Sequence, residues 1–339
     1  MKHNTIVIGL IAWIVLIFNG CSGGAGSAAF GGGSTAFKQY EAPKNTGTKI
    51  VYKDKIVEKE KIIYKDKIVY KGGDVSSAKQ SRMAYKNSSQ DFNFQNNPKK
   101  NYTSYALIIG ISNYKSNSDV AYADKSALAF EELAKTTLGI PPENITTLLN
   151  SDATSGQLKD KLNYIKNIPE EGDTIYLFYA GHGLPDKDGN VYLLPSDMSA
   201  DSINEEPKLQ VNYIYKNLSK SLASNIFVFM DSCFSGQDDN KKGLYKGVAA
   251  ATMVNKMKVR GKKLTVMTAG ASNQFANDYK DKEHRLFSYY LINELAKGEK
   301  NLSKVYKIIR RSIKRISLNK GNGYMQVPQI YGDSSKNLY

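Results

Sequence analysis

Short apolar runs alternate with amphipathic segments from about residue 101 to the C-terminus. Consecutive apolar residues predict buried strands at Tyr105–Ile111, Ile145–Leu149, Thr174–Tyr179, Asn225–Met230, Lys263–Thr268 and Gln326–Ile330, with a small hairpin near Val191–Leu194. Helical spacing of apolar residues predicts helices at Lys125–Leu138, Ser155–Ile168, Val211–Leu222, Leu286–Leu295 and Leu302–Ile316. Asp124 and Thr154 are the expected N-caps of the first two. This alternation predicts an α/β domain over 101–339 with a mostly parallel sheet and helices on both faces.

The N-terminus has the layout of a signal peptide. Lys2 and His3 precede an uncharged apolar run, Thr5–Phe18, and Cys21 follows it before a Gly/Ser/Ala tract. A cysteine at this point resembles a bacterial lipoprotein signal, which implies cleavage before Cys21 and lipidation of that residue. We therefore expect residues 1–21 to place the protein on the cell envelope, facing the periplasm or the exterior. An uncleaved anchor and ordinary secretion are the alternatives, although the run is short for a spanning helix.

A linker is expected over residues 22–100. Four hexapeptides, KIVYKD, KIVEKE, KIIYKD and KIVYKG, occupy residues 49–72, and a period of six fits neither a helix nor a strict alternation. We expect an extended, charged stalk here, with a coiled or β-paired oligomerisation segment as the alternative. Residues 73–100 are polar, and we expect them to be disordered.

Positive charge is concentrated before the predicted domain. Residues 1–100 hold 16 Lys and Arg against 7 Asp and Glu, and residues 101–339 hold 31 against 25. The basic stalk suits contact with anionic lipid head groups or wall polymers. The sequence has no nucleic-acid-binding motif, so we expect no such partner.

Two short strings carry the candidate chemistry. The string Tyr-Ala-Gly-His-Gly begins at the last residue of one predicted strand and contains His182. The string Asp-Ser-Cys-Phe-Ser-Gly follows another predicted strand and contains Cys233, 51 residues later. Open parallel sheets place their chemistry at such strand ends. Cys21 belongs to the export segment, so Cys233 is the one thiol of the domain, which excludes a disulfide there. The inventory of cysteines and histidines also excludes a Cys₂His₂ zinc site.

A thiol and an imidazole together indicate a cysteine peptidase. The thiol attacks as a thiolate, so it needs a nearby base, and His182 is the best candidate. Glycines on both sides of His182 let the backbone approach a substrate closely. The backbone N–H groups of Gly183 and Cys233 are candidate donors to the developing oxyanion.

The two strings resemble the His and Cys blocks of caspase-like peptidases, and DSCFSG is similar to the D-x-C-x-S-G form of metacaspases and their bacterial relatives. The resemblance spans Tyr105–Asp333 and includes YALIIGISNY, LLPSD, VMTAGASNQFA, LFSYYLINEL and QVPQIYG. It implies the caspase–hemoglobinase fold and peptide-bond hydrolysis by a Cys/His dyad. The alternatives are a catalytically silent binding or scaffold module and a transpeptidase that uses the same acyl-enzyme.

The resemblance also implies a specificity pocket. Metacaspases cut after Arg or Lys, and their pocket acids correspond to Asp231 and Asp124 in this sequence. Charge-assisted hydrogen bonds from such a pair would select protein or peptide substrates with basic residues. The basic stretch from 237 to 263 is then a candidate for self-cleavage, with a solvated surface loop as the alternative.

No cofactor is required by this chemistry, but calcium is a candidate because some metacaspases depend on it. Carboxylate oxygens are the ligands that Ca²⁺ prefers. The acids in roughly comparable regions are Asp197, Glu205, Glu206, Asp238 and Asp239.

Overall fold

The computed structural model describes residues 50–58, 61–69, 77–88, 92–234, 259, 261–271 and 274–339, with the backbone alone for 50–58, 61–69 and 86–88. The chain divides into two compact units, one ending at Gly72 and the other starting at Gly73. Cys21 and the predicted export segment lie outside the described residues, as do Asp238, Asp239 and most of the basic stretch at 237–263.

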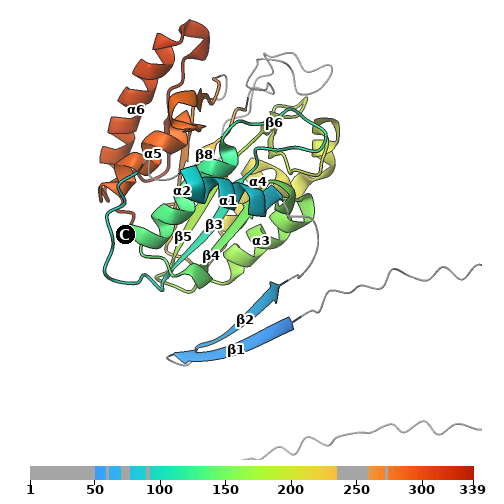
Figure 1. Cartoon of the computed structure of the whole chain (residues 1–339), viewed down its shortest axis with the longest axis vertical. Helices are drawn as coiled ribbons and strands as arrows, with labels where there is room; N and C mark the ends of the chain where they lie inside the picture. Colours follow the sequence, from blue (N-terminus) through green and yellow to red (C-terminus); the bar gives the residue numbers. More distant parts are fainter. Residues whose placement is uncertain are drawn as a thin grey trace, which may run out of the picture. The chain divides into compact units, whose positions relative to one another are not determined.

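The hexapeptide repeats form a β-hairpin in the first unit (Figure 1). Strand β1 (Ile50–Glu58) pairs antiparallel with β2 (Lys61–Val69), from Ile50 opposite Val69 to Glu58 opposite Lys61. The first two repeats therefore pair with the last two. This corresponds to the β-paired alternative rather than to a single extended stalk, and the pairing lies within one chain. The Ile and Val content of each repeat favours such strands.

The expectation of disorder over residues 73–100 was wrong for the described part of that segment. Ser77–Ser88 form helix α1, which belongs to the second unit. Residues 92–100 belong to the same unit and have no regular secondary structure. Arg82 donates to Glu131 at 2.9 Å, and the ring of Phe92 lies 5.3 Å from that of Tyr289. A polar composition hid these few specific contacts, each of which depends on residues far along the chain.

A six-stranded sheet organises the second unit, in the order β12-β9-β8-β5-β3-β4. All neighbours are parallel except β12, which pairs antiparallel with β9 at the edge. The strands are β3 (Ser104–Gly110), β4 (Ile145–Leu149), β5 (Thr174–Ala180), β8 (Asn225–Asp231), β9 (Leu264–Thr268) and β12 (Gln329–Tyr331). Two small antiparallel pairs lie outside it: β6 (Gly183–Pro185) with β7 (Val191–Leu193), and β10 (Asp278–Tyr279) with β11 (His284–Arg285).

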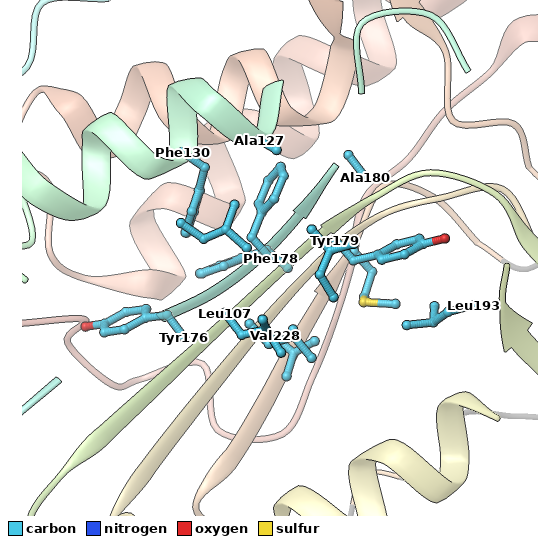
Figure 2. Close-up of a cluster of buried hydrophobic side chains, with 14 of the residues drawn as sticks. Leu107, Ala127, Phe130, Tyr176, Phe178, Tyr179, Ala180, Leu193 and Val228 are labelled. Carbon is cyan, nitrogen blue, oxygen red and sulfur yellow. The ribbon is translucent and has the colours of Figure 1, made fainter. Parts of the chain in front are cut away.

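Helices cover both faces of this sheet, which confirms the predicted α/β class (Figure 1). They are α2 (Ala123–Thr136), α3 (Ser155–Asn167), α4 (Val211–Leu218), α5 (Leu286–Ala296) and α6 (Leu302–Asn319). Short 3₁₀ turns occupy Pro142–Asn144, Asn150–Asp152, Ala200–Glu205, Pro207–Leu209, Lys280–Lys282 and Asn322–Tyr324. Figure 2 shows Phe130 of α2 against Phe178 of β5, and their rings stack at 4.5 Å. Residues Ile175–Ala180 are wholly buried, as continuous apolar strands of a covered parallel sheet should be.

The helix caps agree with the sequence at one helix and differ at another. Thr154 caps α3, and its hydroxyl accepts the N–H of Gln157, as predicted. The N-cap of α2 is Tyr122, in the left-handed conformation with φ of 63°, and Asp124 lies in the first helical turn instead. Within the described part of the chain, no helix combines the length and apolarity that crossing a bilayer requires.

Candidate active site

His182 and Cys233 lie at the same edge of the sheet. Strands β5 and β8 are parallel neighbours in which Ala180 pairs with Asp231, and each candidate residue follows its strand end by two positions. Both are buried, with 3% of His182 and 7% of Cys233 exposed. Parallel pairing thus places two residues that are 51 positions apart in the sequence at adjacent strand ends.

The turn that carries His182 packs directly against the turn that carries Cys233. A Cβ atom added to Gly183 would lie 2.6 Å from both Ser232 Oγ and Phe234 Cδ1. Contacts this short exclude any larger residue without movement of the neighbours. The residues on either side of Cys233 therefore touch the residue after His182, and the glycine makes that approach possible.

Two tyrosines hold the backbone of His182. Its N–H donates to Tyr114 Oη at 2.8 Å, and its carbonyl accepts from Tyr179 Oη at 2.6 Å. Both hydroxyls pack over Gly181, where an added Cβ would lie 2.7 and 2.9 Å from them. Burial raises the pKa of both tyrosines well above the ordinary value, so they remain protonated donors and acceptors at physiological pH.

The imidazole of His182 is oriented by a backbone carbonyl. Ring atom Nε2 lies 2.8 Å from the oxygen of Ser118, and the ring packs 4.8 Å from that of Tyr114. Because a carbonyl oxygen only accepts, Nε2 carries a hydrogen in this bond. The neutral ring then keeps the lone pair on Nδ1 as its basic nitrogen. The contribution of Ser118 and Tyr114 was not predicted, because a backbone acceptor and a packed hydroxyl leave no motif in a sequence.

The sulfur of Cys233 contacts the segment that follows β9. The Ala276 N–H points to Sγ at 2.9 Å, and the Ala276 carbonyl oxygen lies 3.6 Å from the same sulfur. A backbone donor at this position favours the charged form of a sulfur. The arrangement therefore suits a thiolate nucleophile.

Arg285 is a buried cation beside this contact, and the sequence did not reveal it. Only 1% of the residue is exposed, although it occupies the N-cap position of α5. Its guanidinium donates to the carbonyl oxygens of Ala276, through Nη2, and of Ala121, through Nη1 at 3.4 Å. An arginine that precedes an apolar helix looks the same in sequence whether it faces solvent or the interior.

Asp231 is fully buried against the start of α5. Its Oδ2 accepts the Ser288 N–H at 2.8 Å and the Ser288 hydroxyl at 2.6 Å. Ser288 lies in the first turn of α5, where the helix dipole favours a negative charge. Asp231 thus joins the strand that carries Cys233 to the next helix.

Asp124 lies at the start of α2 in a different network. Its Oδ1 accepts from Ser112 Oγ at 2.6 Å, and its Oδ2 accepts from Ser81 Oγ at 2.5 Å and Asn150 Nδ2 at 3.2 Å. It is partly exposed. Among the described residues, Asp124 and Asp231 have no hydrogen-bond partner in common. Asp231 ends β8, Asp124 lies in the helix that follows β3, and β5 lies between these two strands in the sheet.

Two of the acids considered for calcium have other partners. Asp197 Oδ1 accepts the Ser155 N–H at 2.8 Å, and Glu206 pairs with Lys159 at 2.7 Å. No group of three or more potential metal ligands occurs in the described part of the chain. Asp197, Glu205 and Glu206 alone therefore do not make a calcium site. Asp238 and Asp239 lie outside the described residues, so the calcium site stays a prediction.

Comparison with known proteins assigns the sequence to a family. The sequence profile of the caspase domain matches residues 103–339. A solved structure of the protein GSU0716 from Geobacter sulfurreducens is similar at 20% identity over 69% of this chain and 97% of that one, with a TM-score of 0.46. Caspase-1 from Spodoptera frugiperda is similar at 13% identity over 72% and 91%, with a TM-score of 0.44. No protein with a curated description matches by sequence. Since the profile covers more than half of its length, the chain belongs to the caspase-domain family of cysteine peptidases.

Proposed function

We propose that this protein is a cysteine endopeptidase in which Cys233 is the nucleophile and His182 the general base and acid. The observation that supports this most directly is the contact of Gly183 with both neighbours of Cys233, combined with the Ser118 carbonyl bond that leaves Nδ1 of His182 basic. Nucleophile and base on adjacent turns, with the base oriented by a third group, are the usual requirements of covalent catalysis.

The reaction follows from these positions. The Cys233 sulfur attacks the scissile carbonyl carbon, and its proton goes to Nδ1 of His182. The N–H groups of Gly183 and Cys233 donate to the oxyanion. The His182 proton then passes to the leaving amine as the C–N bond breaks, which gives an acyl-enzyme. A water molecule, deprotonated by His182, hydrolyses the thioester and restores the thiol.

Tyr114 and Tyr179 contribute by fixing the base rather than by reacting. They hold the N–H and the carbonyl of His182, and the ring cannot swing away without loss of its Ser118 bond. Positioning of this kind lowers the entropic part of the barrier.

A preference for Arg or Lys at the cleavage site is the finer part of the proposal. Asp124 is accessible enough to meet a substrate cation, and Asp231 adds negative charge two residues before the nucleophile. Charge-assisted hydrogen bonds to a guanidinium or ammonium would provide the selection. Asp231 already accepts from Ser288, and Asp124 accepts from three side chains. Direct contact with the substrate falls to Asp124 because it is partly exposed, whereas Asp231 is fully buried and acts mainly through its charge.

The test compares peptides that differ in one residue. Purified protein should cleave fluorogenic peptides that end in Arg or Lys faster than one that ends in Asp, and Cys233→Ala should abolish cleavage. Cys233→Ala with unchanged activity would refute the assignment. Asp124→Asn should reduce the Arg-to-Asp preference while a neutral peptide is cleaved as before. Product analysis with an added amine separates hydrolysis from transpeptidation.

Tethering and calcium dependence complete the proposal. The Cys21 motif supports a lipid anchor in the cell envelope, and metabolic labelling with a fatty acid should be lost in Cys21→Ser. Incubation with and without calcium, followed by mass-spectrometric mapping of new termini, tests both calcium activation and self-cleavage in 237–263. New termini after Lys or Arg that are absent in Cys233→Ala would support self-processing.

A further inference from the structure

Arg285 and the sulfur of Cys233 share one acceptor. The Ala276 carbonyl oxygen lies 3.6 Å from Sγ and accepts a hydrogen bond from the guanidinium of Arg285. A single oxygen atom therefore separates a permanent cation from the candidate nucleophile. The Ala276 N–H meanwhile donates to the same sulfur at 2.9 Å.

The position of Arg285 is fixed from several sides. Its own N–H donates to Ser126 Oγ of α2 at 2.9 Å, and Nη1 reaches the Ala121 carbonyl at 3.4 Å. The side chain is thus held between the start of α2 and the start of α5. An arginine stays charged in any protein environment, and burial strengthens its field because little water screens it.

The charge of Arg285 is felt across this site. It acts to lower the pKa of Tyr114, against the larger opposite effect of burial, and Tyr114 is the tyrosine that holds His182. The titratable or charged groups around the sulfur include His182 after β5, Tyr114 bonded to it, Asp231 at the end of β8, and Arg285 at the start of α5.

We propose that Arg285 is a positioning residue that fixes Ala276 against the sulfur and favours the thiolate of Cys233. The guanidinium competes with the S–H group for the Ala276 carbonyl oxygen, and its charge attracts the negative sulfur. The proposal deepens the cysteine-peptidase function, since it assigns a residue that prepares the nucleophile of that site.

Alkylation of Cys233 by iodoacetamide, followed by mass spectrometry of the Cys233 peptide in the full chain, measures the thiolate directly. In Arg285→Gln the alkylation rate at pH 6 should fall roughly tenfold, since the rate is proportional to the fraction of Cys233 that is thiolate. Near pH 9 the rates of the variant and of wild type should converge, because the thiol is largely ionised in both. Arg285→Lys keeps the charge and should lie closer to wild type. Lys187→Gln, which removes an exposed cation between β6 and β7, should leave the profile unchanged.

The outcomes are distinct. Equal slowing at every pH, or identical profiles for Arg285→Gln and Arg285→Lys, would overturn the proposal, because neither depends on charge. If Arg285→Gln unfolds, the test rests on Arg285→Lys alone. A pH profile of alkylation like that of wild type supports the role of charge. A rate at pH 6 more than tenfold below that of wild type overturns the proposal. Alkylation needs no peptide substrate, so it remains informative even if Cys233→Ala showed that hydrolysis does not depend on this thiol.

The outer face of α6 carries a second, independent feature. Helix α6 holds six cations and no acid, which equals the whole net charge of residues 101–339. Lys307, Arg310, Arg311 and Lys314 are exposed, and none has an ion-pair partner among the described residues. An open recess over the helix runs between Tyr306 and Leu318. Ile308 is 43% exposed among these charges.

We infer that this face docks on an anionic phospholipid surface. A basic helix face with interspersed apolar side chains matches the interface of such a membrane. The helix packs on α5 at the outside of the unit, so its basic face is accessible (Figure 1). The predicted envelope location favours a membrane over nucleic acid as the polyanion.

Vesicle sedimentation of the full chain tests this inference. The fourfold variant Lys307→Gln, Arg310→Gln, Arg311→Gln and Lys314→Gln should bind vesicles of phosphatidylglycerol and phosphatidylcholine at least tenfold more weakly than wild type. A control with four other lysines changed to Gln, Lys187, Lys216, Lys220 and Lys280, should bind nearly as wild type. Equal binding by both variants, or stronger binding of wild type to duplex DNA than to the vesicles, would overturn it.

Discussion

Gly183→Ala tests whether the two turns of the active site are as close as the structure has them. The new methyl carbon would lie 2.6 Å from Ser232 Oγ and from the Phe234 ring. Those groups must move by about 1 Å to reach van der Waals separation, and Cys233 lies between them in the chain. Overpacking of this kind costs about 1–3 kcal/mol of folding stability.

The effect on activity should exceed the effect on stability. Displacement of a nucleophile by about 1 Å lowers the rate roughly 100-fold. We therefore expect kcat/KM for a basic fluorogenic peptide to fall by about that factor, while urea denaturation still gives a cooperative transition with a midpoint below that of wild type.

Gly156→Ala is the matched control. Gly156 lies in the first turn of α3, where an added Cβ meets no atom within 4 Å. Alanine in a helix is favoured over glycine by about 0.5–1 kcal/mol, so this variant should be as active as wild type and no less stable. If Gly183→Ala matched Gly156→Ala in both assays, the packing of the two turns described above would be incorrect.

Three further predictions concern the groups around the site. Ser288→Ala removes one donor to the buried carboxylate of Asp231 and should lower the free energy of unfolding by about 1–3 kcal/mol in urea titration; an unchanged midpoint would contradict that bond. Tyr114→Phe leaves the buried His182 N–H without its acceptor, so peptidase kcat should fall and stability should drop by about 1–3 kcal/mol, whereas wild-type kcat would show that the bond does not position the base. Burial, with lesser effects of two nearby lysines, lowers the pKa of His284 to about 3. As pH falls below about 6.5, the unfolded chain therefore binds a proton that the folded chain does not. The free energy of unfolding of wild type should fall by about 2 kcal/mol between pH 7.5 and 5, and His284→Gln should lack this loss.

The sheet could be predicted from sequence because its strands are continuous apolar runs. Thr174–Tyr179 and Asn225–Met230 were each placed within one residue of β5 and β8. Connectivity alone does not give their pairing, since the consecutive strands β4 and β5 are not neighbours in the sheet. Once β5 and β8 pair in parallel, however, His182 and Cys233 follow adjacent strand ends. Local patterns sufficed because burial on both faces leaves few polar positions in such strands.

The surroundings of the two residues could not be predicted in the same way. The Ser118 carbonyl, the Ala276 backbone and the Arg285 guanidinium act through positions that depend on tertiary packing. The role of Asp124 as an N-cap was wrong because Tyr122 adopts a left-handed conformation, which a sequence pattern does not encode for tyrosine. The disorder expected before residue 100 was wrong because α1 is stabilised by distant partners.

Helix α1 bears on where this peptidase can be shortened. The family match begins at residue 103, but Ser81 and Arg82 donate to Asp124 and Glu131, and Phe92 packs on Tyr289. A recombinant fragment trimmed to the family boundary would expose those carboxylates and an aromatic surface to solvent. The smallest version suitable for crystallisation or enzymology therefore starts upstream of α1, between the hairpin and Ser77.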